Sequence, residues 1–166
     1  SGYPVVAILD MSDMWVTFNI KETLMPKIRM GKRLRGYVDF TLIELPETRL
    51  PDDPSPAQIA QGLAKEAELI RARIPKGAWF CVLTPEGTQL SSEELAAALA
   101  SVKGSGRSAA CFLIGSSFGM DPSLKQLADR KLSMSKMTFP HHLARVMLLE
   151  QLYRAYQIDA GTRYHK

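Results

Sequence analysis

Cysteine is scarce in this sequence of 166 residues, in which Cys81 and Cys111 are the only two. Each lies inside an apolar, strand-like run, so we interpret both as buried thiols of a protein from a reducing compartment and expect no disulfide. No apolar run approaches the roughly 18 residues of a membrane-spanning helix, and no stretch has the features of a secretory signal. These absences predict a cytoplasmic protein that does not bind a membrane.

Several catalytic motifs are missing as well. The sequence has no GxSxG nucleophile elbow and no HExxH motif, and the adjacent His141 and His142 do not suit metal ligation side by side on a helix. The run IGSSFG at 114–119 lacks the middle glycine of the dinucleotide fingerprint GxGxxG, and no P-loop lysine follows it. A serine hydrolase, a zinc enzyme and a P-loop NTPase are therefore not expected, and we predict no metal site.

Charge is unevenly distributed along the chain, whose net charge is +4. Residues 37–100 carry five basic and ten acidic side chains, whereas residues 124–166 carry eight basic and three acidic ones. A basic C-terminal third is typical of a protein that binds a polyanion, but a solvated helix surface accounts for the same charges. Charge alone leaves both interpretations open.

Strand-like and helix-like segments alternate from residue 38 onward. β-branched and aromatic residues predict a strand over 38–45, and short apolar runs predict strands over 78–84 and from residue 110. PEGTQL (85–90) and KLSMSKMTF (131–139) are predicted to be loops. This alternation is typical of an α/β domain with a mainly parallel sheet, in which ligands bind at the carboxyl ends of the strands. The small-molecule site is therefore predicted at the loops after 84 and 114.

Helix signals stand between these strands. Serine N-caps followed three residues later by Gln or Glu predict helices over 56–74 and from 92, and an Asp-Pro pair predicts a helix from 122 that includes Leu132. The last helix is expected from about Pro140 to Ile158.

The last helix carries many polar side chains for its apolar pattern. Tyr153 and Tyr156 with Arg145 and Arg154 combine stacking rings with phosphate-binding guanidinium groups, as nucleic-acid-binding proteins do, but packing against a partner subunit explains the tyrosines equally well. The two histidines at its start are interpreted either as anion donors or as hydrogen-bonded core groups. Because its apolar residues cover more than one stripe, we predict a homodimer built on this helix.

The C-terminal part of the chain resembles a known family. IGSSFG, SKMTFPH (135–141), EQLYRAY (150–156) and the terminal YHK are similar to the RlmH family, and the similarity continues upstream to about residue 32. These are SPOUT-class methyltransferases that use S-adenosyl-L-methionine (AdoMet), form obligate dimers and methylate N3 of a pseudouridine in large-subunit ribosomal RNA. The resemblance implies a SPOUT-type α/β fold, with a mainly parallel sheet, helices on both faces and a C-terminal trefoil knot.

The resemblance also implies a set of cofactor contacts. By position, the residues expected to bind AdoMet are Leu83, Gly115, Met134, Ser135, Lys136, Met137, Thr138 and Phe139. Ser116 stands where the family has the second glycine of its IGG motif. A β-carbon there is expected to crowd the cofactor or to require a different backbone angle.

Residues of the last helix and the tail are expected to act on the RNA. Catalytic roles are predicted for His165, which would accept a proton, and for Arg154 and Tyr153. The residues expected to contact ribosomal RNA, in the assembled ribosome, carry a positive charge or an aromatic ring: Arg145, Arg154, Tyr164 and Lys166. Some of these groups are expected to come from the second subunit of the dimer.

The first 31 residues do not match the family pattern. YPVVAILD (3–10) is a candidate for the family's first strand, whereas residues 13–31 resemble a segment of HlyD-type adaptor proteins, with a strand predicted over 14–20. We expect a single methyltransferase domain over 1–166, with an atypical segment at 1–31 and a knotted cofactor-binding and dimerisation region at 110–166. The alternative interpretations are a catalytically silent RNA-binding module, a chimeric chain with impaired activity and an envelope adaptor fragment.

Overall fold

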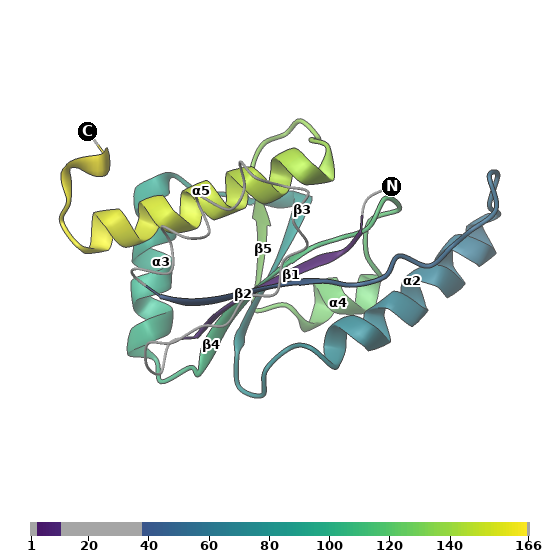
Figure 1. Ribbon diagram of the computed structural model, residues 1–166, viewed down its shortest axis with the longest axis horizontal. Helices are drawn as coiled ribbons and strands as arrows, with labels where there is room; N and C mark the ends of the chain where they lie inside the picture. The colour runs from purple at the N-terminus through teal and green to yellow at the C-terminus, as the bar shows by residue number, and fades with distance from the viewer. Residues whose placement is uncertain (1–2, 11–37, 166) are drawn as a thin grey trace.

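The computed structural model describes residues 3–10 and 38–165. In this part of the chain a five-stranded sheet with the strand order β2-β1-β4-β3-β5 has helices on both faces (Figure 1). The strand predicted over 14–20, the HlyD-like segment and Lys166 lie outside the described residues.

The strands are β1 (Val5–Asp10), β2 (Asp39–Glu44), β3 (Trp79–Gln89), β4 (Ala109–Ile114) and β5 (Arg130–Ser133). The helices are α2 (Pro56–Arg71), α3 (Ser92–Gly104), α4 (Pro122–Leu127) and α5 (His141–Asp159), and the short 3-10 helix η1 (Arg163–His165) follows α5. No helix among the described residues is long and apolar enough to cross a membrane.

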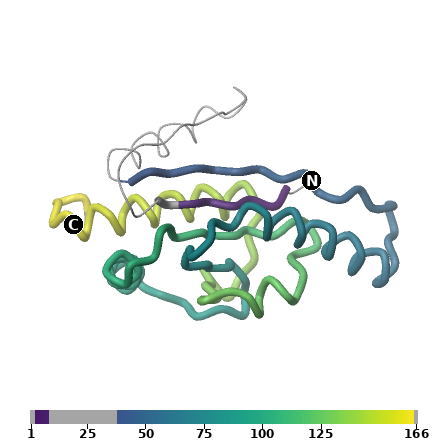
Figure 2. The backbone as a smooth tube through the Cα atoms, turned by 90° about the horizontal axis from the view of Figure 1, so that it is seen from below, coloured from purple at the N-terminus to yellow at the C-terminus, as the bar shows by residue number. Residues whose placement is uncertain are grey.

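The sheet is parallel in one part and antiparallel in the other. β3 pairs in parallel with both β4 and β5, whereas β1 runs antiparallel to β2 and to β4. Figure 2 shows β2 and β1 side by side along one edge of the molecule. The strands are therefore parallel at β4, β3 and β5, as expected, whereas β1 runs in the opposite direction. The alternation that predicted parallel strands begins at residue 38, so it carries no information on the direction of β1.

β3 is longer than predicted and contains a bulge. Leu132 of β5 pairs with both Leu83 and Thr88, so residues 84–87 form a bulge between the two pairs. At Gly87 an added β-carbon would lie 2.6 Å from the backbone carbonyl carbon of Leu132, so only glycine permits this close approach. The prediction of a loop over 85–90 is therefore wrong up to Gln89, where β3 ends. The prediction of a loop over 131–139 is wrong up to Ser133, where β5 ends.

The helices follow their capping signals. Both serine capping boxes form, and Asp121 accepts a hydrogen bond from the backbone of Ser123 at the start of α4. α5 has the predicted extent to within about one residue at each end. α4 ends at Leu127, so the prediction that this helix includes Leu132 is wrong, because Leu132 belongs to β5.

Two apolar layers enclose the sheet. Along the fully buried β4, Ala110, Phe112 and Ile114 pack on the side of α3 and α5, and the alternate residues pack on the side of α2 and α4. Cys81 and Cys111 are buried and free, as predicted. Burial raises the pKa of each thiol to about 12, so neither is a nucleophile at neutral pH.

Candidate functional site

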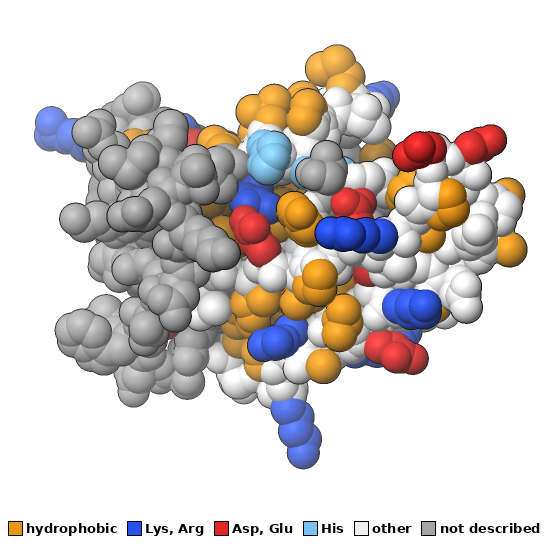
Figure 3. Space-filling model, turned by 45° about the vertical axis from the view of Figure 1, so that its right-hand side comes forward, with side chains coloured by type: hydrophobic (Ala, Val, Ile, Leu, Met, Phe, Trp, Pro, Cys, Tyr) orange, Lys and Arg blue, Asp and Glu red, His pale blue; other side chains and the backbone are white. Residues whose placement is uncertain are grey.

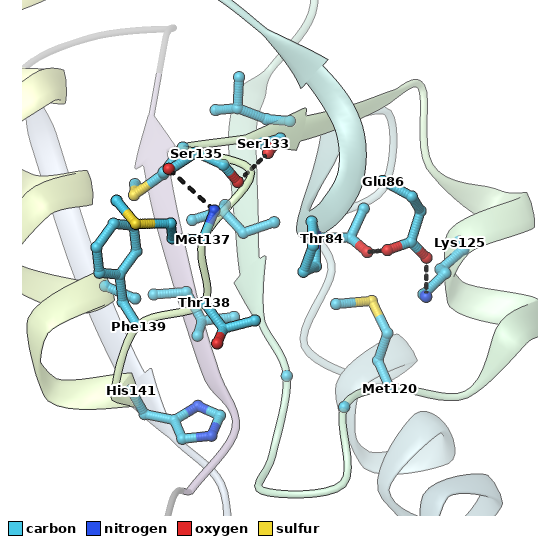
Figure 4. A pocket seen from close by; sticks show the side chains of 18 of the residues that line it. Thr84, Glu86, Met120, Lys125, Ser133, Ser135, Met137, Thr138, Phe139 and His141 are labelled. Atoms are coloured by element: carbon cyan, nitrogen blue, oxygen red, sulfur yellow. Dashed lines mark hydrogen bonds and ion pairs between the residues drawn. The ribbon is translucent and has the colours of Figure 1, made fainter.

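A cavity of about 340 Å³ lies where β4 ends, β3 bulges and the chain approaches α5 (Figure 4). Its size lies within the usual range of small-molecule sites, roughly 300–1,000 Å³. Its walls come from the β3 bulge, the end of β4 with the loop that follows it, α4, the end of β5 with the loop that follows it, and the start of α5. The cavity therefore matches the site that the strand pattern predicts after residues 84 and 114.

A closed turn between β4 and α4 forms one wall of the cavity. The backbone N–H of Ser116 donates to the carbonyl of Gly119 at 2.7 Å, and the N–H of Gly119 donates back to Ser116 at 2.8 Å. Gly119 has a φ of +91°, which glycine adopts without strain. A β-carbon on Gly115 would lie 2.4 Å from the carbonyl oxygen of Gly119. The turn therefore requires glycine at both Gly115 and Gly119.

Ser116 does not crowd the cavity. Its side chain is 2% exposed, donates to the Gly119 carbonyl at 3.3 Å and is not part of the lining. Among the described residues only glycines have positive φ, so Ser116 sits in an ordinary backbone conformation. Ser116 therefore adds no side-chain atom to the lining of the cavity.

The opposite wall is the loop between β5 and α5. Ser133 Oγ donates to the carbonyl of Ser135 at 2.8 Å, and Ser135 Oγ accepts from the backbone N–H of Met137 at 3.1 Å. These bonds fold the loop over the cavity, where Met137 and Phe139 lie on one side and Met120 on the other (Figure 4). Met137 is 69% exposed, so it borders the mouth. Thioether and phenyl groups give this wall an adaptable apolar surface.

The structure brings most of the predicted cofactor residues together. The seven that line the cavity are Leu83, Gly115, Met134, Ser135, Met137, Thr138 and Phe139. Lys136 is exposed and does not line it.

Twelve further residues line the cavity and were not among the predicted cofactor residues, and Thr84, Glu86, Met120, Lys125 and His141 are five of them. The pair Glu86-Gly87, close behind the predicted buried strand, is a sequence signal for Thr84 and Glu86. Lys125 has no local signal, because only the packing of α4 against β3 places it there.

The cavity contains one strong electrostatic interaction. Glu86 accepts hydrogen bonds from Lys125 Nζ and from the Thr84 hydroxyl. These bonds, that from Lys125 first, lower the pKa of Glu86 to about 2, so its carboxylate is ionised throughout the physiological range. Among the described residues that line the cavity, Glu86 and Lys125 are the only ones of types Asp, Glu, Lys or Arg.

A second cluster lies at the far end of α5. The rings of Tyr153 and Tyr164 meet edge to face at 4.9 Å, and the Arg154 guanidinium lies 5.1 Å from the centre of the Tyr164 ring. Arg154 also pairs with Glu150, which raises the pKa of the guanidinium. Tyr153 is 8% exposed, so it anchors the C-terminal segment to the core.

α5 separates this cluster from the cavity within one chain. The 19 residues of α5 span about 28 Å. His141 and Ala144 at its start line the cavity, whereas η1 with His165 follows its end (Figure 1). The predicted cofactor residues and the predicted catalytic residues therefore do not meet in a single chain.

Arg145 does not lie where an RNA-binding residue is expected. It is 3% exposed and pairs with Glu44, the last residue of β2, and its Nε has no hydrogen-bond partner. The guanidinium thus joins α5 to the sheet, and in this position a phosphate group cannot reach it. The prediction that Arg145 contacts RNA is not supported by this position, because local sequence does not reveal a partner 101 residues away.

Ion pairs also reduce the positive charge of the C-terminal third. Lys125, Arg145 and Arg154 each pair with a glutamate. On the face shown in Figure 3, the coloured basic and acidic side chains are interspersed with hydrophobic ones. The described residues contain no group of three or more His, Cys, Asp or Glu side chains arranged to hold a metal ion.

Comparison with known proteins places these features in a family. The family model described as "Predicted SPOUT methyltransferase" matches residues 22–165. The chain is 41% identical to ribosomal RNA large subunit methyltransferase H of Moorella thermoacetica, over 98% of this chain and 97% of that protein. It is 45% identical to the protein of the same name from Bifidobacterium adolescentis, over 82% of this chain and 86% of that protein.

These matches bear on the N-terminal segment as well. The Moorella match spans 162 of the 166 residues and the family model begins at residue 22, so both extend into the segment that the sequence pattern set apart. The likeness of residues 13–31 to HlyD-type adaptors receives no support from these matches. From its coverage by the family model and by these relatives, the chain belongs to the SPOUT methyltransferase family.

Proposed function

We propose that this protein transfers the methyl group of AdoMet to N3 of a pseudouridine in large-subunit ribosomal RNA. The observation that carries the proposal is the cavity, which is lined by seven of the eight residues that the family likeness assigns to the cofactor. The names of the Moorella and Bifidobacterium relatives support ribosomal RNA as the substrate.

The lining of the cavity suits AdoMet chemically. Met120, Met134, Met137 and Phe139 offer apolar and polarisable surface to an adenine ring. Gly115 contributes no side chain to the lining, and serine and threonine hydroxyls add polar groups among the apolar ones, as in most cofactor sites. When bound, AdoMet supplies an electrophilic methyl group on a sulfonium centre. The loop over 134–139 would hold it, exclude water and orient its methyl group toward the opening.

The nucleophile requires a group that accepts its proton. The imide N3 of pseudouridine is a weak acid, so positioning and charge stabilisation contribute as much as a strong base. We assign proton acceptance to His165, because imidazole is the side chain most often used as a general base. Tyr153 holds the tail through its contact with Tyr164, and Arg154 places a positive charge beside it. Negative charge that develops on the base would be stabilised by this guanidinium.

A homodimer is part of this proposal. Because the Tyr164 ring packs on Tyr153, about 14 Å along α5 from Ala144 at the edge of the cavity, we propose that a second chain supplies the tail to each cavity. Leu143, at the start of α5, is 46% exposed, and Val146 and Met147 are only partly buried, so α5 retains apolar surface for a partner helix. We include in the proposal a trefoil knot within residues 110–166, which the family likeness implies, and one domain over 1–166.

RNA contact is proposed for exposed basic residues near the two ends of the site. Lys131, Lys136 and Arg163 are exposed, and Lys166 ends the chain. Such side chains neutralise phosphates without reading sequence. The assembled ribosome in the cytoplasm is the proposed setting, with no metal required by the chemistry.

Mass spectrometry of ribosomal RNA tests the proposed function. A bacterial strain that lacks its own pseudouridine N3 methyltransferase is complemented with this chain, and the large-subunit RNA is digested and analysed. We expect one methyl group restored on one pseudouridine. Unmodified RNA from a strain that expresses folded protein, together with no binding of AdoMet by calorimetry, would instead identify a catalytically silent member of the family.

A further inference from the structure

The charged side chains in the cavity form a single opposed pair. Glu86 comes from the β3 bulge and Lys125 from α4, and the two side chains meet at the edge of the lining opposite the 134–139 loop (Figure 4). Neither belongs to the set of residues that the family likeness assigns to the cofactor. The rest of the lining is apolar or neutral apart from His141.

The bulge holds this pair in place. Gly87 packs against the backbone of Leu132, which fixes the path of the chain directly after Glu86. The Thr84 hydroxyl donates to one carboxylate oxygen of Glu86, and Lys125 donates to the other. The side chains of Glu86 and Lys125 are 56% and 30% exposed, so a ligand can reach both charges.

We propose, as an extension of the proposed methyltransferase function, that Glu86 and Lys125 recognise the amino-acid end of AdoMet. Lys125 binds the α-carboxylate and Glu86 binds the α-ammonium group, so that the ligand's two charges replace the contact between the two side chains. A ligand that is zwitterionic at one end matches a paired cation and anion, and the apolar remainder of the cavity matches the adenine and thioether parts.

The pairing itself favours this ligand end over a sugar hydroxyl. A carboxylate alone is sufficient to accept hydrogen bonds from two hydroxyls, and a lysine beside it would only compete for the same oxygens. Before the ligand binds, the pair leaves no uncompensated charge beside apolar walls. After it binds, each charge again has a partner of opposite sign.

Calorimetry with three ligands tests the inference. AdoMet and S-adenosylhomocysteine carry the amino-acid end, whereas 5′-methylthioadenosine lacks it. For Lys125→Met and Glu86→Gln we expect affinity for the first two ligands to fall roughly tenfold and affinity for 5′-methylthioadenosine to change less than about twofold. Exposed control residues outside the lining are replaced in the same way, by Lys65→Met and Glu68→Gln, and should leave all three affinities unchanged.

The outcomes separate this inference from the function on which it rests. Equal losses for all three ligands would show that the pair only shapes the cavity and would overturn the inference, as would unchanged affinities. In both cases wild-type binding of AdoMet would leave the proposed function standing. If the wild-type protein binds none of the three, the proposed function and the inference fall together. Thermal unfolding of each variant confirms that it is folded.

Discussion

The two ends of α5 differ in what they contact. At its start, His141 and Ala144 line the cavity together with glycine, methionine and serine residues of the β4–α4 and β5–α5 loops. At its end, Tyr153 and Arg154 hold Tyr164 through ring and cation contacts. The first end has a cavity with apolar walls and one ion pair, and the second has aromatic rings beside a guanidinium. One helix keeps them apart, so the proposed function assigns cofactor binding and base handling to separate regions of one chain.

The largest effect is expected at the tail. His165→Ala should lower methylation of ribosomes by about 10²- to 10⁴-fold between pH 6 and 9, because the proton of N3 loses its acceptor. AdoMet affinity should not change, since His165 is assigned to the RNA base and not to the cofactor. Single-turnover methylation assays and calorimetry measure the two quantities. Wild-type methylation across this pH range would refute the role of His165.

The next largest effect is expected on AdoMet affinity, at the cavity beside the start of α5. Gly115→Ala places a β-carbon against the Gly119 carbonyl, so the turn must shift, and we expect AdoMet affinity to fall about 100-fold. Gly104→Ala is the matched control, because a β-carbon there has no atom within 4 Å. Calorimetry measures both variants. Similar affinities for the two would show that the Gly115 wall does not contact the cofactor.

A smaller effect is expected when Arg154, which lies over the Tyr164 ring, is replaced. Arg154→Ala removes the cation from the Tyr164 ring and its pairing with Glu150, and should weaken ribosome binding about five- to tenfold without loss of AdoMet affinity. Arg73→Ala, an exposed arginine on another surface, serves as the control. Equal losses of ribosome and AdoMet affinity in Arg154→Ala would contradict the division between the two ends.

The smallest effect is a titration within the cavity. The pKa of Glu86 is about 2, below its ordinary value of 4.5, so the Glu86–Lys125 pair persists above pH 4.5 and is lost as the pH falls toward 2. In Lys125→Met the pKa should rise toward 4.5, whereas Lys65→Met should leave it low. NMR titration of the glutamate carboxyl carbons measures it. A value near 4.5 in the wild-type protein would show that the pair does not form in solution.

The parts of the fold that depend on local signals are predictable from sequence. Capping boxes at Ser55 and Ser91 mark where α2 and α3 begin, and the continuous apolar run of β4 predicts a strand buried on both faces. Each signal lies within a few residues of the structure it specifies. The cofactor loop over 134–139 was identified by family likeness, since its polar sequence has no periodicity.

The parts that depend on distant partners were missed. β5 has the sequence RKLS, which has little strand character by itself and forms because it pairs with β3. Lys125 reaches Glu86 across 39 residues of sequence, and Arg145 reaches Glu44 across 101. Helical spacing shows that Arg145 lies on α5, but not that the sheet buries it. Tertiary pairing therefore decides which charged residues belong to the site and which belong to the core.

The central claim is that the cavity of one chain works with the tail of another. Co-expression of Gly115→Ala and His165→Ala chains tests it, because a mixed dimer has one site in which neither substitution is present. The account predicts that each variant alone is inactive and that the mixture regains about a quarter of wild-type methylation, if chains pair at random. Methylation that stays at the level of the separate variants, in a mixture shown by mass spectrometry to contain mixed dimers, would contradict it.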